Sequence, residues 1–198
     1  MVKRAFDLIV SFFLLILLSP LFIIIALLIK FDSKGSVFFI QQRVGKNNQD
    51  FSIYKFRTMF TVADRKQQIT IGNHDPRITR VGYFLRRFKL DELPQLINVF
   101  IGNMSLVGPR PEVRKYVSLY NNEQLKVLTL KPGITDYASI EYSNENELLA
   151  NVVDPEKKYI DEIMPAKLKL NLMYIQDQSM LTDLKIIFGT AAKIFLKA

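Results

Sequence analysis

The sequence predicts an α+β fold that is mostly helical and contains one small β-hairpin. Three features predict it: a long apolar run near the N-terminus that a proline interrupts, two β-prone runs around a polar turn, and helical periodicity in most of the remaining chain. With 198 residues the chain is long enough for one domain with a core and too short for two. We therefore expect a re-entrant membrane helix-break-helix over residues 1–34, continuous with one folded domain over residues 35–198.

The apolar run extends from Leu8 to Ile29. At ~1.5 Å of rise per residue, a helix of this length reaches across a hydrocarbon core of ~30 Å. Ser19 and Pro20 lie near the middle of the run, where proline removes a backbone donor and clashes with the preceding turn. The sequence therefore predicts two helices with a kink between them.

Cationic residues flank this run on both sides, with Lys3 and Arg4 before it and Lys30 and Lys34 after it. Because such residues prefer the cytoplasmic side of short membrane segments, both ends favour the same side. This favours a hairpin that enters one leaflet and returns; the alternatives are a kinked helix that spans the bilayer and a buried helix of a soluble protein. The run is too long for a cleaved signal peptide, and no small-residue cleavage pattern follows it.

Two β-prone runs between residues 36 and 60 flank the polar turn KNNQD and predict a β-hairpin. Residues 61–80 are polar and predict a surface loop, in which His74 is an ordinary loop residue. Helical patterns follow at residues 82–88, 93–101, from about 112, 145–151, 155–175 and from 180 onward.

The final helix is predicted to be amphipathic and to begin after Ser179, a favourable capping residue. Lys185 and Lys193 lie away from its apolar stripe. We expect this stripe to pack in the core, and the alternative is an interfacial helix on the membrane surface. The stripe consists of Leu181, Leu184, Ile187, Phe188, Ala191 and Phe195.

Composition restricts the chemistry available to the chain. The absence of cysteine excludes disulfides, a cysteine nucleophile and thiolate metal ligands, and a single histidine excludes a His-rich metal site. Carboxylates, Lys, Arg, hydroxyl groups or a hard cation must therefore carry any reaction. The net charge of +8 indicates anionic partners such as phosphate groups, lipid headgroups or nucleic acid.

Two adjacent acids, Asp91 and Glu92, stand in the segment LDELPQL, just before a predicted helix that has Pro94 near its start. One interpretation is that they cap this helix and complement its positive end, and the pattern alone favours it. The other interpretation is catalytic: one carboxylate binds Mg²⁺ while its neighbour acts as a nucleophile, with the helix dipole and the cation keeping both ionised.

Basic residues accompany the acids. Lys55 and Arg57 alternate along the second predicted strand, so both can point to one face as a phosphate-binding pair, although an exposed basic strand edge has the same pattern. Arg86 lies about one helical turn from Asp91 and is either a surface charge or a phosphate ligand near the carboxylates.

Arg110 stands between Pro109 and Pro111 in the segment LVGPRPE. Proline on both sides restricts the backbone, which limits the entropy lost when the guanidinium binds a diphosphate or a base edge. A purely structural turn explains the triplet equally well when it is taken alone.

The order of these segments is more informative than any one of them. The apolar hairpin with Ser19 and Pro20, then KFRTM, LRRFKLDELPQL, NMSLVGPRP and KPGIT, together resemble the bacterial sugar transferase family, the monotopic phosphoglycosyl transferases in their minimal catalytic-domain form. The resemblance runs from about Lys3 through Gly133 and continues more weakly to the end. After PGIT this chain reads DYASIEYSNENE, where many relatives have Gly, an aromatic, Gln and Asn-Gly, so the resemblance does not specify a sugar.

The resemblance implies that Asp91 is the nucleophile that attacks the β-phosphate of a UDP-sugar, forming a phosphosugar-aspartyl enzyme and releasing UMP. Glu92 would hold Mg²⁺, and polyprenol phosphate would then take the sugar phosphate from Asp91. Lys55 and Arg86 match family positions that bind phosphate. The triplet around Arg110 matches one that lies near the nucleotide diphosphate and uridine.

The resemblance also implies a location and a pathway. It places the chain at the bacterial inner membrane, with the catalytic domain over residues 35–198 on the cytoplasmic face and in contact with membrane lipid. The reaction would be the first membrane step of a surface glycan such as a capsule, exopolysaccharide, O-antigen or glycoprotein, with downstream glycosyltransferases as possible partners.

The competing hypothesis is a membrane-anchored basic protein that binds nucleic acid or anionic lipid, or that acts as a scaffold, without catalysis. Nucleic acid is disfavoured as a partner because the basic residues are scattered among apolar segments and no known reading motif accompanies them.

Overall fold

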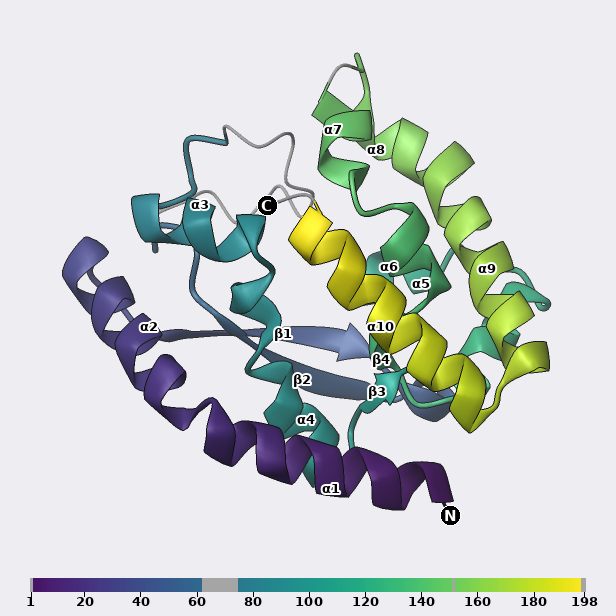
Figure 1. Cartoon of the computed structure of the whole chain (residues 1–198). Helices are drawn as coiled ribbons and strands as arrows, with labels where there is room; N and C mark the ends of the chain where they lie inside the picture. The colour runs from purple at the N-terminus through teal and green to yellow at the C-terminus, as the bar shows by residue number, and fades with distance from the viewer. Residues whose placement is uncertain (1, 62–74, 151, 197–198) are drawn as a thin grey trace.

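The computed structural model describes residues 2–61, 75–150 and 152–196. Two helices, α1 (Val2–Leu17) and α2 (Ser19–Asp32), form an arc along one side of the molecule (Figure 1). The other elements are β1 (Phe38–Val44), β2 (Asp50–Phe56), α3 (Arg80–Arg87), α4 (Gln95–Ile101), β3 (Ser105–Val107), α5 (Arg114–Val117), β4 (Gly133–Thr135), α6 (Tyr137–Glu141), α7 (Glu145–Ala150), α8 (Pro155–Lys158), α9 (Met164–Asp177) and α10 (Met180–Leu196).

The predicted break in the apolar run is present. α1 and α2 meet at Leu18 with a bend of 60°, and Ser19 Oγ donates a hydrogen bond of 2.8 Å to Ile16 O. Pro20 lies in the first turn of α2, where its missing N–H removes no helical hydrogen bond. Among the described residues no single helix is long and apolar enough to cross a membrane, whereas this bent pair together has that length and composition.

The predicted β-hairpin is confirmed as an antiparallel pair of β1 and β2, in which Phe38 is opposite Phe56. Asn47 and Asn48 lie in the turn with φ of 57° and 62°, a left-handed conformation that asparagine tolerates better than most residues. The polar KNNQD segment therefore makes the turn that joins β1 to β2.

A second sheet, which the sequence did not predict, joins β3 and β4 in parallel. Each strand has three residues, too few for a periodic pattern to be recognised. The close approach of the two backbones requires glycine, because a Cβ on Gly133 would lie 2.1 Å from the backbone nitrogen of Gly108. This sheet brings the NMSLVGPRP and KPGIT segments side by side.

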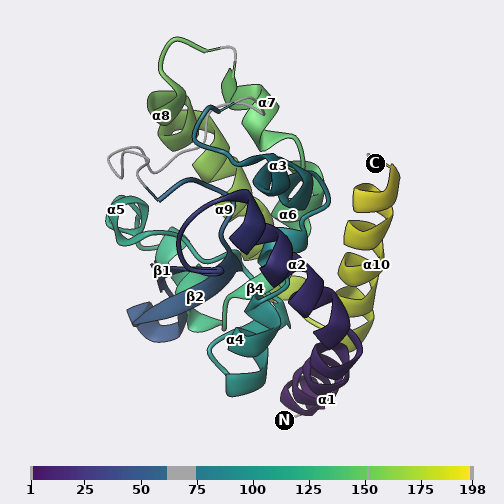
Figure 2. The same cartoon turned by 90° about the vertical axis from the view of Figure 1, so that its left-hand side faces the viewer.

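In the part of the chain that the structure describes, three apolar clusters form the core, and two of them include the N-terminal helices, of which α2 faces the viewer in Figure 2. One packs α1 against α4, β3 and α10 around Val99 and Met104. Another packs Ile29 of α2 against Phe56 and Leu85. The third lies between α5 and the helices α7 to α9. The N-terminal pair therefore shares its core with β2 and α3.

A polar contact also fixes α1 to the rest of the molecule. The buried Asp7 accepts hydrogen bonds from Ser105 Oγ at 2.8 Å and from Leu106 N at 3.1 Å. Because a buried carboxylate without partners is costly, these bonds specify how α1 lies against β3.

The helical predictions are confirmed with shifted ends. α4 begins at Gln95 after a 3-10 turn rather than at residue 93, and α5 begins at Arg114 rather than near residue 112. Residues 155–175 are helical throughout but include a π-helical turn, Tyr159–Ile163. Most of the predicted loop, residues 62–74 with His74 among them, lies outside the described residues.

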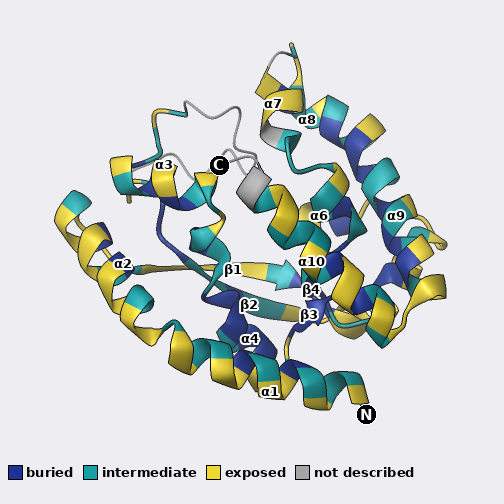
Figure 3. Cartoon of the chain, in the orientation of Figure 1, coloured by how far each residue is buried: buried dark blue, intermediate teal, exposed yellow. Residues whose placement is uncertain are grey.

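α10 begins after Ser179 as predicted, and the Ser179 hydroxyl caps its first turn. The expected core packing of its stripe is wrong for much of that stripe, since Leu181 is 64% and Phe188 is 70% exposed. The buried positions are Asp183 and Ile186, because α10 contacts the body through an acid that pairs with the start of α1. Figure 3 shows exposed positions along α10 and along the outer side of α1 and α2.

Candidate active site

Asp91 and Glu92 lie in the 3-10 turn, Leu90–Glu92, between α3 and α4. Lys89 precedes this turn with φ of 57°, a left-handed conformation that costs a non-glycine residue about 1 kcal/mol or more. Within the described residues α4 has no side-chain cap, and its N-cap position is Pro94. The interpretation of the two acids as caps of this helix is therefore wrong.

Two cations from distant segments meet at Glu92. Lys55 Nζ lies 2.9 Å from Oε1, and Arg110 Nη1 donates to Oε2 at 3.1 Å while its Nη2 also contacts the carboxylate. All three side chains are largely buried, so solvent screens their charges only weakly. This ion-pair cluster joins β2, the 3-10 turn and the Pro-Arg-Pro segment.

The two adjacent carboxylates have opposite electrostatic environments. Burial alone would raise the pKa of Glu92, but Arg110 and Lys55 hold this pKa well below its ordinary range. Burial, and then the charge of Glu92, raise the pKa of Asp91. Glu92 is therefore the more stable anion of the two, and Asp91 is the more basic carboxylate.

Arg86 is a third cation near the acids. From the last turn of α3 its Nε donates to Thr58 Oγ1 at 2.8 Å. Burial lowers the pKa of Arg86, and the negative charge of Asp91 acts against that shift. The structure thus brings Lys55, Arg86 and Arg110 together around the acid pair.

Arg57 does not lie with this group. Its guanidinium donates to the carbonyl oxygens of Ser33, Lys34 and Ser36 at 2.8, 2.7 and 2.6 Å, at the end of α2. The predicted alternation does not apply here because β2 ends at Phe56, one residue earlier. In this structure Arg57 holds the connection after α2.

Pro109, Arg110 and Pro111 follow β3 directly, and β4 holds them in place. Gly133 N donates to Pro109 O at 3.0 Å, and Gly108 N donates to the carbonyl at the end of β4, also at 3.0 Å. The backbone that carries the guanidinium is therefore fixed by proline geometry and by pairing with the KPGIT segment.

Asp136 is a buried residue of this site that sequence reasoning missed. Its Oδ2 accepts from Arg110 N at 3.1 Å, and its Oδ1 accepts from both N and Oγ of Ser139 at 2.6 Å. The missed signal was Asp-X-X-Ser at the start of a helix, the pattern of an N-cap. Asp136 thus caps α6 and positions the Arg110 backbone at once.

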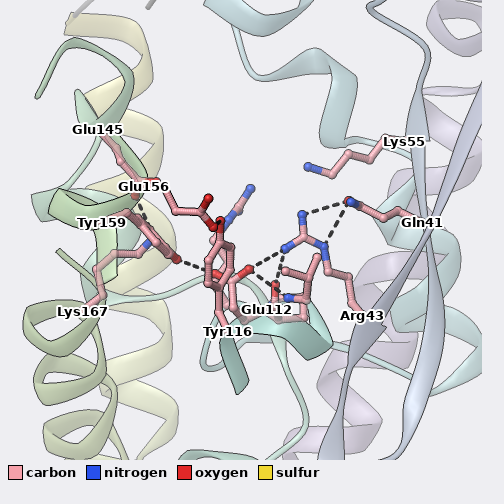
Figure 4. Close-up of polar contacts among 12 residues, drawn as sticks. Gln41, Arg43, Lys55, Glu112, Tyr116, Glu145, Glu156, Tyr159 and Lys167 are labelled. Atoms are coloured by element: carbon pink, nitrogen blue, oxygen red, sulfur yellow. Dashed lines mark hydrogen bonds and ion pairs between the residues drawn. The ribbon is translucent and has the colours of Figure 1, made fainter. Parts of the chain in front are cut away.

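A second half-buried glutamate, Glu112, follows the triplet, and sequence reasoning also missed it. One of its oxygens accepts from Arg43 Nη1 at 2.9 Å, and the other contacts the Tyr159 hydroxyl (Figure 4). Burial, and then the charge of Glu112, raise the pKa of Tyr159, so its hydroxyl stays protonated and donates. The signal was absent from the sequence because the three residues come from distant segments.

Asp91 and Glu92 are the candidate protein ligands for Mg²⁺. Among the described residues no three acidic or histidine side chains come together in a way that could hold a metal ion. Mg²⁺ needs fewer protein ligands, because it is commonly bound through one or two carboxylates together with phosphate and water. Asp91 and Glu92 supply hard oxygen atoms in that number, and the lowered pKa of Glu92 keeps it anionic. The residues present therefore fit Mg²⁺.

The comparison with known proteins extends over the whole chain. The family model described as bacterial sugar transferase matches residues 1–197. UDP-glucose:undecaprenyl-phosphate glucose-1-phosphate transferase of Escherichia coli (strain K12) is 38% identical over 205 residues, which cover 99% of this chain and 40% of that protein.

Two further relatives differ in length and in name. The UDP-N-acetylgalactosamine-undecaprenyl-phosphate N-acetylgalactosaminephosphotransferase of Aeromonas hydrophila is 36% identical, over 98% of this chain and 43% of that protein. Exopolysaccharide production protein ExoY of Sinorhizobium fredii (strain NBRC 101917 / NGR234) is 35% identical, over 98% of this chain and 85% of that protein. The chain thus spans less than half of several relatives and most of another.

Proposed function

Because this chain belongs to the bacterial sugar transferase family, we propose that it transfers a sugar-1-phosphate from a UDP-sugar to a polyprenol phosphate. The names of the relatives support both the donor and the undecaprenyl phosphate acceptor. One observation carries the proposal for this chain: a buried, basic carboxylate, Asp91, lies beside a glutamate held between Lys55 and Arg110.

Asp91 is the nucleophile in this proposal. Its carboxylate oxygen forms a bond to the β-phosphorus of the UDP-sugar, and the bond from that phosphorus to the bridging oxygen breaks, so UMP leaves with the electron pair. A phosphate oxygen of the polyprenol phosphate then attacks the same phosphorus and frees the carboxylate. The raised pKa of Asp91 makes its carboxylate a better nucleophile than an ordinary exposed aspartate.

The cations around Asp91 supply the charge complement that phosphoryl transfer requires. Arg110 can bind two phosphate oxygens at once with its planar guanidinium, and Lys55 and Arg86 add positive charge from two other segments. Positioned cations of this kind contribute several kcal/mol, on the order of 10²–10³ in rate for each group. Glu92 would hold Mg²⁺, which when bound neutralises charge on the diphosphate.

The N-terminal pair is the membrane attachment in this proposal. Its outward side carries large exposed apolar residues on both helices, which water does not favour in a soluble protein. We place it as a re-entrant segment in the bacterial inner membrane, with the site on the cytoplasmic face, where the acceptor phosphate meets it. The exposed residues include Ile9, Phe12, Phe13, Ile16, Leu17, Ile23, Ile24, Leu27 and Phe31.

The topology can be tested with single cysteines, since the chain has none of its own. Cysteines introduced at Val2 and Ser36 should both resist a membrane-impermeant thiol reagent in spheroplasts until the membrane is opened. Opposite labelling of the two positions would establish a spanning segment instead.

The reaction is tested by product analysis of the purified chain with UDP-sugars and polyprenol phosphate. UMP and a diphosphate-linked sugar are the expected products. In the absence of acceptor, intact mass spectrometry should show a phosphosugar on the protein, and peptide mapping should place it on Asp91. Release of UDP in place of UMP would contradict both the nucleophile and the reaction class.

A further inference from the structure

A cavity of about 220 Å³ lies beside the ion-pair cluster, and Arg110 contributes to both. Its wall also includes Tyr116, Tyr159 of the π-helical turn, Glu145 of α7, and Lys167 and Asn171 of α9. The inference drawn from this cavity rests on the proposed function and concerns the part of the donor that the phosphate site leaves unassigned. Relatives named for glucose and for N-acetylgalactosamine resemble this chain almost equally, so overall similarity does not select the sugar.

Two of the three cations in the cavity wall are paired with acids of the same wall, and the third, Arg110, pairs with Glu92 of the ion-pair cluster. Lys167 Nζ lies 2.7 Å from Glu145 Oε2, and Arg43 Nη1 lies 2.9 Å from Glu112 Oε1, as Figure 4 shows. Away from Arg110, a wall with compensated charge does not favour a phosphate group, and the cations around Asp91 are the ones proposed to bind the phosphates. It suits a neutral group that carries many hydrogen-bonding atoms.

Two side chains of the wall, Asn171 and Glu145, have acceptor capacity that no hydrogen bond among the described residues uses. Asn171 is 5% exposed, and its Oδ1 is buried with no hydrogen-bond partner among the described residues. The Glu145 carboxylate has lone pairs beyond the one that Lys167 uses. A buried acceptor left unpaired costs about 1–3 kcal/mol. A pyranose offers several hydroxyl donors, whereas a uracil ring offers a single N–H.

The sugar is also the donor component nearest the reacting phosphorus. It is bonded to the β-phosphate that Asp91 attacks, whereas the base is separated from that phosphate by the ribose and the other phosphate. The pKa of Arg110 is raised chiefly by Glu92 and also by Glu145, so the carboxylate of the cavity lies within electrostatic reach of the phosphate-binding cation.

We propose that this cavity binds the sugar ring of the donor and that Glu145 and Asn171 determine which sugar hydroxyls are accepted. Tyr116 and Tyr159, with ring centroids 5.1 Å apart, supply the apolar part of the wall. Aromatic surface of this kind packs against the C–H face of a pyranose while the polar residues bind its hydroxyls.

The test compares wild-type protein with Glu145→Gln and Asn171→Leu, measuring kcat/KM for UDP-glucose, UDP-galactose, UDP-N-acetylglucosamine and UDP-N-acetylgalactosamine. Each variant should lower kcat/KM for the preferred donor about tenfold and change the ratio between C4 epimers about fivefold. Inhibition by UMP, which has no sugar, should stay within about twofold. Glu147→Gln makes the same charge change at an exposed position of α7 and should change neither quantity.

Two results would overturn the proposal. A weaker inhibition by UMP with unchanged sugar selectivity would place the base in this cavity. Unchanged selectivity and unchanged UMP inhibition in Glu145→Gln, which removes only a charge from a half-buried position, would remove the cavity from donor binding altogether. Neither result affects the proposed function, which fails separately if wild-type protein releases UDP. Circular dichroism of each variant checks the fold.

Discussion

Two half-buried glutamates, Glu92 and Glu112, each pair with an arginine, yet their surroundings differ in kind. Glu92 is held by Arg110 and Lys55, two cations that a phosphate would also attract. Glu112 is held by one arginine, by a tyrosine hydroxyl and by the backbone N–H of Val113 at 2.8 Å.

The cations around Glu92 can exchange this carboxylate for a phosphate group, whereas the partners of Glu112 hold it in the fold. The partners of Glu112 include two neutral donors, the Tyr159 hydroxyl and the Val113 N–H, in addition to one cation, so its carboxylate is satisfied by groups of the fold itself. The partners of Glu92 are exchangeable cations beside a second carboxylate. We therefore expect the same residue type to have a chemical role in one region and a structural role in the other, and four predictions test this contrast.

The largest effect on kcat is expected at Asp91, which lies beside Glu92 and has no counterpart beside Glu112. Asp91→Asn replaces a carboxylate with a poor nucleophile of the same shape, and we expect kcat to fall by about 10⁴ or more. UMP release and intact mass report the loss of turnover and of the covalent species. Near wild-type turnover in this variant would contradict the covalent mechanism.

The second prediction compares the two glutamates directly. Glu92→Gln should lower kcat by about 10³ and weaken the dependence of the rate on Mg²⁺, because a ligand anion is lost. Glu112→Gln should instead lower the free energy of unfolding by about 1–3 kcal/mol with a much smaller change in kcat. UMP assays over a Mg²⁺ series and urea unfolding distinguish them, and equal kinetic losses would mean that the contrast is not real.

The third prediction concerns Arg110, the residue that the two regions share. Arg110→Ala should slow UMP release about 10²-fold and raise KM for the donor, since the proposed role of the guanidinium is to bind the phosphates. Arg110→Lys keeps the charge but loses the fork, so it should recover part of the rate only. Steady-state kinetics of both variants give the measurement, and full activity of the alanine variant would exclude Arg110 from phosphate binding.

The smallest expected effect is on the free energy of unfolding, to which the two adjacent carboxylates contribute with opposite signs. The folded pKa of Glu92 is depressed, so its stabilisation is present above its unfolded pKa and is lost as the pH falls through the folded value. The folded pKa of Asp91 is raised, so its buried charge destabilises the protein at neutral pH, and protonation relieves this as the pH falls. Asp91→Asn should therefore stabilise the protein at pH 7 by about 1 kcal/mol, and Glu92→Gln should destabilise it. Thermal unfolding at pH 7 and at pH 5 measures both signs, and a destabilised Asp91→Asn would contradict the first.

Much of this organisation could be predicted from local sequence. Ser19 and Pro20 specify the break, because proline inside a long helical run removes a backbone donor and clashes with the preceding turn whatever the distant contacts are, and KNNQD specifies the hairpin turn. The order of the motifs predicted the family, which the match over residues 1–197 confirms. The roles assigned to Asp91, Glu92 and the cations remain predictions, but the structure brings most of those residues together.

The parts that could not be predicted depend on contacts between distant segments. Glu112 meets Arg43 and Tyr159 only after the chain has folded, and no local pattern signals this. The apolar stripe of α10 was recognised, but periodicity does not say whether a stripe faces the core or the outside. Strand alternation predicts that Arg57 lies beside Lys55, but β2 ends at Phe56, so the alternation does not reach Arg57.

The contact between β3 and β4 has a consequence for recombination among related enzymes. With a Cβ at Gly133 only 2.1 Å from the Gly108 nitrogen, neither segment accepts a side chain at that crossing. A chimera that exchanges the arginine-bearing loop must therefore take its glycine partner from the same parent or from one with the same crossing.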